Sequence, residues 1–189
     1  HAKHTEKYTE EEQYKMLRFI TLHANKGGNV KIDVHGAENL PKDNGFMFFP
    51  NHQGLYDVLA IIEACPRPFS VVAKKEIANI QFLKQVFACM KAYMLDREDV
   101  RQAMQVIVHV TEEVKRGRNY LIFAEGTRSK NGNKVGEFKG GSFKSATKAK
   151  CPIVPVALID SFKPFDTNTI NPVTVQVHFL EPIYYEEYQ

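Results

Sequence analysis

Several features that would assign the chain to a common class of protein are missing from its 189 residues. Tryptophan is absent and there are only three cysteines. Cys65, Cys89 and Cys151 are odd in number, far apart and without CxxC spacing, so they indicate neither a disulfide framework nor a zinc site. A reducing, cytosolic environment fits this pattern best.

Long hydrophobic runs are missing as well. No apolar run approaches the roughly 18 to 20 residues of a membrane-spanning helix, and no signal peptide is recognisable. The chain begins at His1 rather than Met, which leaves room for a natural membrane segment upstream. If the protein acts on lipid, we expect it to lie on the cytoplasmic face of the membrane as a peripheral or monotopic protein.

The chain also lacks a strong charge of either sign. Its net charge of +3 is too small to indicate a nucleic-acid partner. Between residues 126 and 159, however, there are seven basic residues and only one acidic residue, Glu137. The seven are Arg128, Lys130, Lys134, Lys139, Lys144, Lys148 and Lys150. Such a segment is either an ordinary solvated face or a site for an anionic headgroup or a phosphorylated carrier.

Histidine is present but without metal-ligand spacing. The seven histidines contain no pattern such as HExxH. We therefore expect neither a metal nor a redox cofactor.

The hydrophobic pattern predicts strands that alternate with helices. Strands are expected at 30–34, 46–49, 69–73, 93–95, 120–123, 153–158 and 173–179. The clearest helical pattern runs from Val100 to Gly117, where apolar residues follow one face. This order predicts an α/β fold with a mostly parallel or mixed central sheet flanked by helices.

A helix is also predicted near the N-terminus. Thr9 and Glu12 have the spacing of a capping box, and an apolar pattern from Tyr14 to Leu22 continues until Gly27. The helix is amphipathic, so it either contacts lipid or packs on the core. We expect it to form an N-terminal segment, residues 1–28, ahead of one globular domain, residues 29–189.

The first block with chemical content follows the apolar run 46–49. It reads PNHQGLYD and contains His52 and Asp57. In a continuous helix these residues would point about 140° apart, so they can meet only if the chain bends, and Gly54 supplies freedom for a bend. A carboxylate that binds one imidazole nitrogen leaves the other able to accept a proton from an alcohol. The block has no Ser or Cys, so the alcohol would belong to a substrate. Most His and Asp pairs at this spacing are merely structural.

Three more blocks accompany the first. AEGTRS, residues 124–129, follows a predicted strand and offers an arginine and backbone amides, which suit a phosphate, although a Glu125 to Arg128 surface pair is an alternative. YMLDR ends in Arg97 after another strand. PIVPV, residues 152–156, is a buried strand whose prolines limit its pairing.

Together the four blocks resemble the glycerolphosphate acyltransferase family, most closely its bacterial 1-acyl-sn-glycerol-3-phosphate branch, the lysophosphatidic acid acyltransferases. The resemblance covers roughly residues 30–180, and NHQGLYD combined with FAEGTRS is highly specific. It implies a membrane-associated enzyme of phospholipid biosynthesis that carries the NHxxxxD motif. Its donor would be acyl-CoA or acyl-carrier protein, its acceptor lysophosphatidic acid, and its product phosphatidic acid.

The resemblance also implies roles for particular residues. His52 and Asp57 correspond to the catalytic pair, and Arg97, Glu125, Gly126, Thr127 and Arg128 to the substrate-phosphate site. A KKE stretch of the family matches Lys74, Lys75 and Glu76, of which the lysines are candidate donor or headgroup contacts.

The chain departs from the family pattern at several positions. Gly54 stands where the first block often has serine, and Lys91 where the second often has glycine. A proline that is common after KKE, in a region that helps to form the acyl tunnel in relatives, is missing, and the final helix of many relatives lies beyond Gln189.

Other functions remain compatible with these motifs. The acceptor could be another lysolipid or glycerol 3-phosphate, because the motifs define the reaction better than the acceptor. A thioesterase would use water instead. A non-catalytic lipid-binding module would be expected to have lost His52 or Asp57, and both are present.

Overall fold

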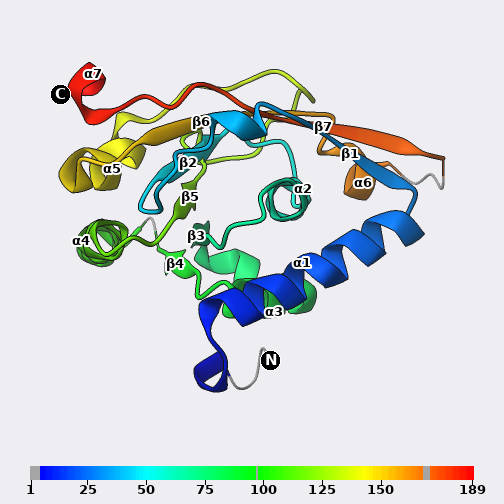
Figure 1. Cartoon of the computed structure of the whole chain (residues 1–189), viewed down its shortest axis with the longest axis horizontal. Coiled ribbons are helices and arrows are strands. Elements are labelled where there is room, and N and C mark those ends of the chain that lie inside the picture. Colours follow the sequence, from blue (N-terminus) through cyan, green and yellow to red (C-terminus); the bar gives the residue numbers. More distant parts are fainter. Residues whose placement is uncertain (1–4, 97, 168–170) are drawn as a thin grey trace.

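A computed structural model describes residues 5–96, 98–167 and 171–189 of the chain, apart from the side chains of Thr5 and Ala78. Its centre is a strongly twisted seven-stranded sheet flanked by helices (Figure 1). The strands are β1 (Val30–His35), β2 (Met47–Pro50), β3 (Ser70–Lys74), β4 (Tyr93–Leu95), β5 (Tyr120–Ile122), β6 (Ile153–Ile159) and β7 (Val173–Phe179). All seven predicted strands are confirmed, with ends within one residue of the expected ones.

The sheet is mixed, as predicted. Its order is β1-β7-β6-β2-β5-β3-β4, and every neighbouring pair is parallel except β6 and β7. The ladder between β6 and β7 begins at Val156, immediately after Pro155, so the proline does limit pairing on that side. Because β2, β3 and β5 are parallel neighbours, the loops that follow them meet at one edge of the sheet.

Seven α-helices and four short 3-10 helices are described. The α-helices are α1 (Glu10–Gly27), α2 (Asp57–Ala64), α3 (Gln81–Cys89), α4 (Val100–Lys115), α5 (Lys144–Ala149), α6 (Lys163–Asp166) and α7 (Tyr185–Tyr188). The 3-10 helices are η1 (Thr5–Lys7), η2 (Ala37–Asn39), η3 (Lys75–Asn79) and η4 (Gly140–Phe143). None of the helices in the described ranges is both long and apolar enough to cross a membrane.

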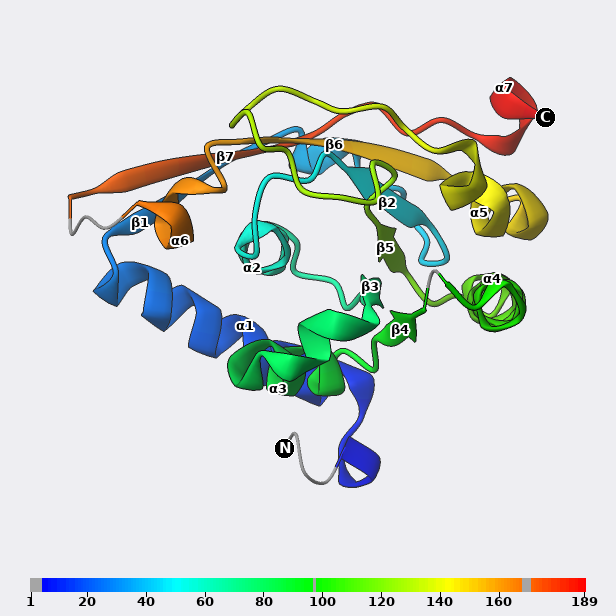
Figure 2. The same ribbon diagram turned by 180° about the vertical axis from the view of Figure 1, so that it is seen from behind.

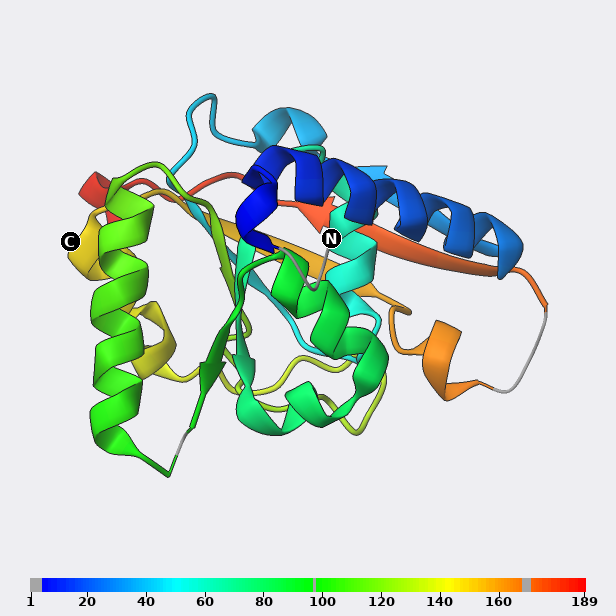
Figure 3. The ribbon, with the colours of Figure 1, turned by 90° about the horizontal axis from the view of Figure 1, so that it is seen from below.

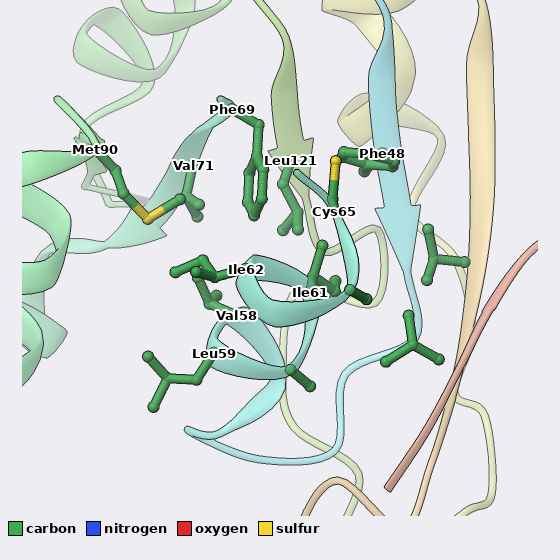
Figure 4. Packing of buried hydrophobic residues seen from close by; sticks show 14 of the residues in the cluster. Phe48, Val58, Leu59, Ile61, Ile62, Cys65, Phe69, Val71, Met90 and Leu121 are labelled. Carbon is green, nitrogen blue, oxygen red and sulfur yellow. The ribbon is translucent and has the colours of Figure 1, made fainter. Parts of the chain in front are cut away.

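The helices cover both faces of the sheet. α2 and α4 lie on opposite sides of β5, with α1 and α3 on the side of α2 and α5 on that of α4 (Figures 1 and 2). Strand β2 supplies both faces, because Phe48 packs in the cluster that contains α2 while Met47 and Phe49 pack in the cluster that contains α4. The larger cluster is built on α2, whose Ile61 lies toward Leu121 of the sheet and whose Ile62 lies toward Val71 (Figure 4).

Helix α1 begins with the predicted capping box, in which Thr9 accepts from the backbone of Glu12 and Glu12 from that of Thr9. Its apolar face is mostly packed on the core. Tyr14 and Leu17 are buried, and the Tyr14 hydroxyl donates to the Cys65 carbonyl at the end of α2. Of the two alternatives for this helix, packing on the core therefore holds for Tyr14 and Leu17. Its large exposed apolar residues are Phe19 and Ile20.

Lys91, one of the departures from the family pattern, has a strained backbone conformation. Its φ is 51°, in the left-handed region that costs a non-glycine residue roughly 1 to 2 kcal/mol. The strain is part of the turn from α3 into β4, where the Lys91 amide donates to the Ala88 carbonyl. A glycine at this position would avoid the strain.

Replacing Lys91 with glycine is therefore expected to stabilise the protein. Relief of the strain, less the greater entropy of glycine in the unfolded chain, should raise the free energy of unfolding by about 0.5 to 1 kcal/mol. Chemical denaturation measures this. The matched control is Lys84→Gly on the exposed face of α3, which should lower the same quantity by about 1 kcal/mol. A loss of stability in Lys91→Gly would contradict the argument.

Candidate active site

His52 and Asp57 meet at the edge of the sheet where β2 ends. His52 lies in the loop after β2, and Asp57 is the first residue of α2. The chain bends between them as predicted, and His52 Nδ1 lies 2.7 Å from Asp57 Oδ2. The imidazole also stacks on Phe123, with 3.9 Å between ring centroids. No hydrogen bond to its other nitrogen, Nε2, is found within the described ranges.

Gly54 allows the bend for a different reason from the one expected. Its φ lies outside the left-handed region, so the extra conformational freedom of glycine is not what the loop uses. What matters is the missing side chain, because a Cβ at this position would lie 3.2 Å from Phe162 Cα and 3.6 Å from the Ser161 carbonyl. The turn after β6 therefore packs directly against the loop that holds His52.

Asp57 is fully buried, and its charge is compensated by several donors. Besides His52, the amides of Gln53 and Gly54 donate to it at 2.7 and 3.0 Å, and so does the hydroxyl of Ser161. The N-terminus of α2 adds a favourable dipole. A buried carboxylate is stable only with such compensation. Its orientation toward His52 is therefore well defined.

Glu125 is also buried, and it lies at the junction between two loops. Its Oε1 accepts from the His52 amide at 2.7 Å and its Oε2 from the Gly136 amide at 2.6 Å. The alternative of a surface pair with Arg128 is therefore wrong. Both carboxylate oxygens are used within the protein, so Glu125 fixes the backbone of His52.

Gly126 shapes the turn that follows. Its φ of +70° lies in the left-handed region, and its amide donates to the Phe123 carbonyl at 3.1 Å. The turn brings Gly126, Thr127 and Arg128 to the wall of the same cavity as His52.

This cavity has a volume of about 660 Å³, and its lining contains both charged and apolar side chains. Its polar and charged lining residues include His52, Lys74, Glu76, Thr127, Arg128, Lys139 and Ser142. The apolar part of the lining, called the apolar arm below, comes mainly from the sheet, α3 and α4. Its wall includes Val71, Ile77, Ile80, Leu83, Phe87, Ala103, Val106, Ile107, Val110 and Ile122. Helices α3 and α4 lie on either side of β4 when the molecule is seen from below (Figure 3).

The predicted cations differ in how they relate to this cavity. Arg128 lines it, is exposed, and forms no ion pair or hydrogen bond with any described residue. Lys74 also lines the cavity, and its Nζ lies 3.3 Å from Glu76 Oε1. Lys75 does not line it and pairs with Asp96 at 2.5 Å, which raises the pKa of Lys75. Arg97 lies outside the described residues.

No cysteine offers a nucleophile at this site. The three thiols are buried, and desolvation raises the pKa of each, that of Cys151 to about 12. Thiolate, the reactive form, is therefore scarce at neutral pH. Ser142 and Ser145 line the cavity, but their hydroxyls donate to the carbonyls of Ala124 and Ile107, and no hydrogen bond joins either serine to His52 in the described ranges. Across the described ranges, no group of three or more His, Cys, Asp or Glu side chains is arranged to hold a metal ion.

Sequence reasoning missed three residues of the site. Lys139 was visible only as one member of the basic excess. Gln53 lies inside the first block, but its side chain points away from the cavity wall and donates to the Leu158 carbonyl at 2.9 Å. Ser161 had no local signal, because it follows Asp57 by 104 residues.

The sequence was also compared with known proteins. The family described as Acyltransferase matches residues 31–159, more than half of the chain. A 1-acyl-sn-glycerol-3-phosphate acyltransferase of Borreliella burgdorferi is 33% identical over 151 residues, which are 79% of this chain and 60% of that protein. The chloroplastic enzyme BAT2 of Brassica napus is 32% identical, over 82% of this chain and 45% of that protein. The chain thus spans about half of the length of these relatives.

A solved structure shares the fold. The crystal structure of the 1-acyl-sn-glycerophosphate (LPA) acyltransferase PlsC from Thermotoga maritima matches with a TM-score of 0.75 and 24% sequence identity, covering 93% of this chain and 71% of that one. The mixed sheet with flanking helices is therefore common to both. With the family match over residues 31–159, these findings show that the chain belongs to the acyltransferase family.

Proposed function

We propose that this protein transfers a fatty acyl group from acyl-CoA or acyl-carrier protein to the free hydroxyl of lysophosphatidic acid, which gives phosphatidic acid. One observation carries the proposal: His52, which is paired with Asp57, lines a single cavity together with basic side chains and the residues of the apolar arm. The names of the relatives support this choice of acceptor. The reaction requires no metal or redox cofactor.

In the proposed reaction His52 is the general base. Asp57 holds the proton of the imidazole on Nδ1, so Nε2 accepts the proton of the acceptor hydroxyl as its oxygen attacks the thioester carbonyl. The C–O bond forms, the C–S bond then breaks, and the imidazolium returns the proton to the leaving thiolate. Transfer is direct, because the described wall of the cavity offers no activated serine or cysteine.

The two kinds of lining suit the two parts of the substrates. A phosphate would bind at Arg128, with Lys139 and Lys74 nearby, and the amides of the 124–129 turn add further donors. An acyl chain would fill the apolar arm. We propose that Glu125 acts indirectly, by holding the backbone of His52 in place.

Mass spectrometry of the products tests the function. The purified protein is incubated with lysophosphatidic acid and a mixture of acyl thioesters, and phosphatidic acid carrying the donor's chain is expected. Parallel reactions with other lysolipids and with glycerol 3-phosphate identify the acceptor. Free fatty acid released at the same rate with or without a lysolipid would indicate a thioesterase. Lysolipid binding without any product would indicate a binding module.

Arg128→Ala is expected to weaken use of the phosphorylated acceptor. Loss of a charged hydrogen bond should raise the acceptor KM, or lower kcat/KM, by a factor equivalent to roughly 1.5 to 3 kcal/mol. Arg128→Lys should recover only part of this loss. The donor KM should barely move. Steady-state kinetics with each substrate varied in turn measures both effects.

The control for Arg128→Ala is Lys130→Ala, which removes a neighbouring exposed cation that does not line the cavity. It should change neither KM by more than about twofold, as expected of a solvated charge. A rise in the donor KM alone in Arg128→Ala would assign the arginine to the phosphates of the carrier instead.

We also propose that the protein binds the membrane peripherally, through the rim of the apolar arm. Large apolar side chains are exposed on either side of it: Ile80 and Phe82 at α3, and Val100, Met104 and Val108 on α4. The residues on α4 are spaced by four, so they form one stripe next to Ala103 and Ile107 in the cavity wall. An exposed apolar rim of this kind would let an acyl chain enter directly from a bilayer.

Replacing Val100, Met104 and Val108 together with serine should therefore reduce liposome binding. Each buried apolar side chain contributes roughly 1.5 to 3 kcal/mol, so binding should fall at least tenfold. Co-sedimentation with vesicles measures this. Phe19→Ser with Ile20→Ser on α1 is the comparison, and we expect it to have the smaller effect. The opposite order would place the lipid contact on α1.

A further inference from the structure

Ser161 lies in the turn between β6 and α6, far along the chain from the catalytic block. It is fully buried, and its hydroxyl contacts both Asp57 Oδ1 and, at 3.2 Å, Gln53 Oε1. A hydroxyl has one hydrogen to donate. Asp57 is the nearer and the charged acceptor of the two, so the hydroxyl donates to Asp57.

The donors to Asp57 are divided between its two oxygens. Oδ2 accepts from His52 Nδ1 and from the Gln53 amide, both at 2.7 Å. Oδ1 accepts from Ser161 and from the Gly54 amide, and the latter also lies 3.1 Å from Oδ2. Within the described chain Ser161 is therefore the one donor besides His52 that comes from a side chain, and it holds the carboxylate from the side opposite to His52.

The turn that carries Ser161 is tied to the His52 loop. The Ser161 amide donates to Gln53 Oε1 at 2.9 Å, and Gln53 Nε2 donates to the Leu158 carbonyl. Asp160, just before Ser161, has a φ of 64°, and its amide donates to Asn133 at 2.8 Å. A strained residue is maintained only where its surroundings determine it strongly.

We propose that Ser161 is a positioning residue for acyl transfer, and that it acts by fixing the Asp57 carboxylate in the orientation that receives the Nδ1 proton of His52. The missing side chain at Gly54 is part of the same arrangement, because it leaves the space that the Ser161 turn occupies. This inference rests on the proposed function for its kinetic test but not for its spectroscopic one.

The kinetic test is Ser161→Ala, which removes a single atom and should leave the fold intact. We expect kcat to fall on the order of tenfold, the equivalent of one charge-assisted hydrogen bond, while both KM values change less than about twofold. The matched control is Ser70→Ala, because Ser70 is equally buried and donates to the Lys91 carbonyl at 3.0 Å, away from the site. It should leave kcat unchanged.

A double-mutant cycle shows whether the serine acts through Asp57. In an Asp57→Asn background, Ser161→Ala should change kcat by less than about twofold, because the orientation that it fixes is already impaired. An unchanged kcat in Ser161→Ala, or an equal fall in Ser70→Ala, would overturn the proposal. So would a further tenfold fall when Ser161→Ala is added to Asp57→Asn, measured relative to Asp57→Asn alone.

Proton NMR tests the same inference without any turnover. The hydrogen-bonded Nδ1 proton of His52, assigned by its loss in His52→Ala, should change its chemical shift in Ser161→Ala and not in Ser70→Ala. An unchanged shift in Ser161→Ala would overturn the role of Ser161. A wild-type protein that shows this signal but makes no phosphatidic acid would instead overturn the proposed function.

Discussion

His52→Ala is expected to lower kcat for acyl transfer by about 10² to 10⁴, the usual contribution of a positioned general base. The imidazole lines the cavity, and Asp57 leaves Nε2 as the nitrogen that can accept a proton. Among the described residues no second histidine lines this cavity, so nothing there replaces the lost base. The KM values should change little, because the ring contributes to the chemical step more than to binding.

The chain contains a matched control for this variant. His35 lies 3.2 Å from Asp33 and stacks on His178 with 4.3 Å between ring centroids, but it does not line the cavity. His35→Ala thus removes a similar ring with a similar partner, and kcat should be unchanged. If His52→Ala keeps more than about a tenth of the wild-type rate, His52 is not the general base.

The sheet could be predicted because its signals are local. Each strand is a short apolar or alternating run that ends at a turn, as at Met47–Pro50 and Tyr120–Ile122, and parallel pairing then brings the loops after β2 and β5 to one edge. The approach of His52 to Asp57 could be predicted for the same reason, because the two residues are only five apart in the sequence.

What could not be predicted depends on contacts between distant segments and on side-chain direction. A motif gives residue types but not which way they point, and it did not reveal that Glu125 accepts from the amides of His52 and Gly136. The burial of Tyr14 depends on α2, and the position of Ser161 depends on the turn after β6. Gly54 was expected to provide flexibility, whereas its role follows from the approach of Phe162.

Asp57→Asn is expected to reduce kcat by roughly 10², which is the lower end of what general-base catalysis contributes. The effect should therefore be smaller than that of losing His52. The carboxylate accepts on both oxygens, whereas an amide accepts on one and donates from the other. If the amide nitrogen faces His52, it favours the wrong tautomer of the ring.

If the amide oxygen faces His52 instead, the amide nitrogen of this variant faces Ser161 and Gly54. The Ser161 hydroxyl can rotate to accept a hydrogen bond from it, but the Gly54 amide can only donate. The tautomer of His52 then survives in part, but the charge that stabilises the imidazolium is lost in either orientation. Some activity should therefore remain. Asp33→Asn, the same change beside His35, is the control and should have no effect on kcat. The measurement is kcat across pH, and a profile identical to that of the wild type would show that Asp57 does not act with His52.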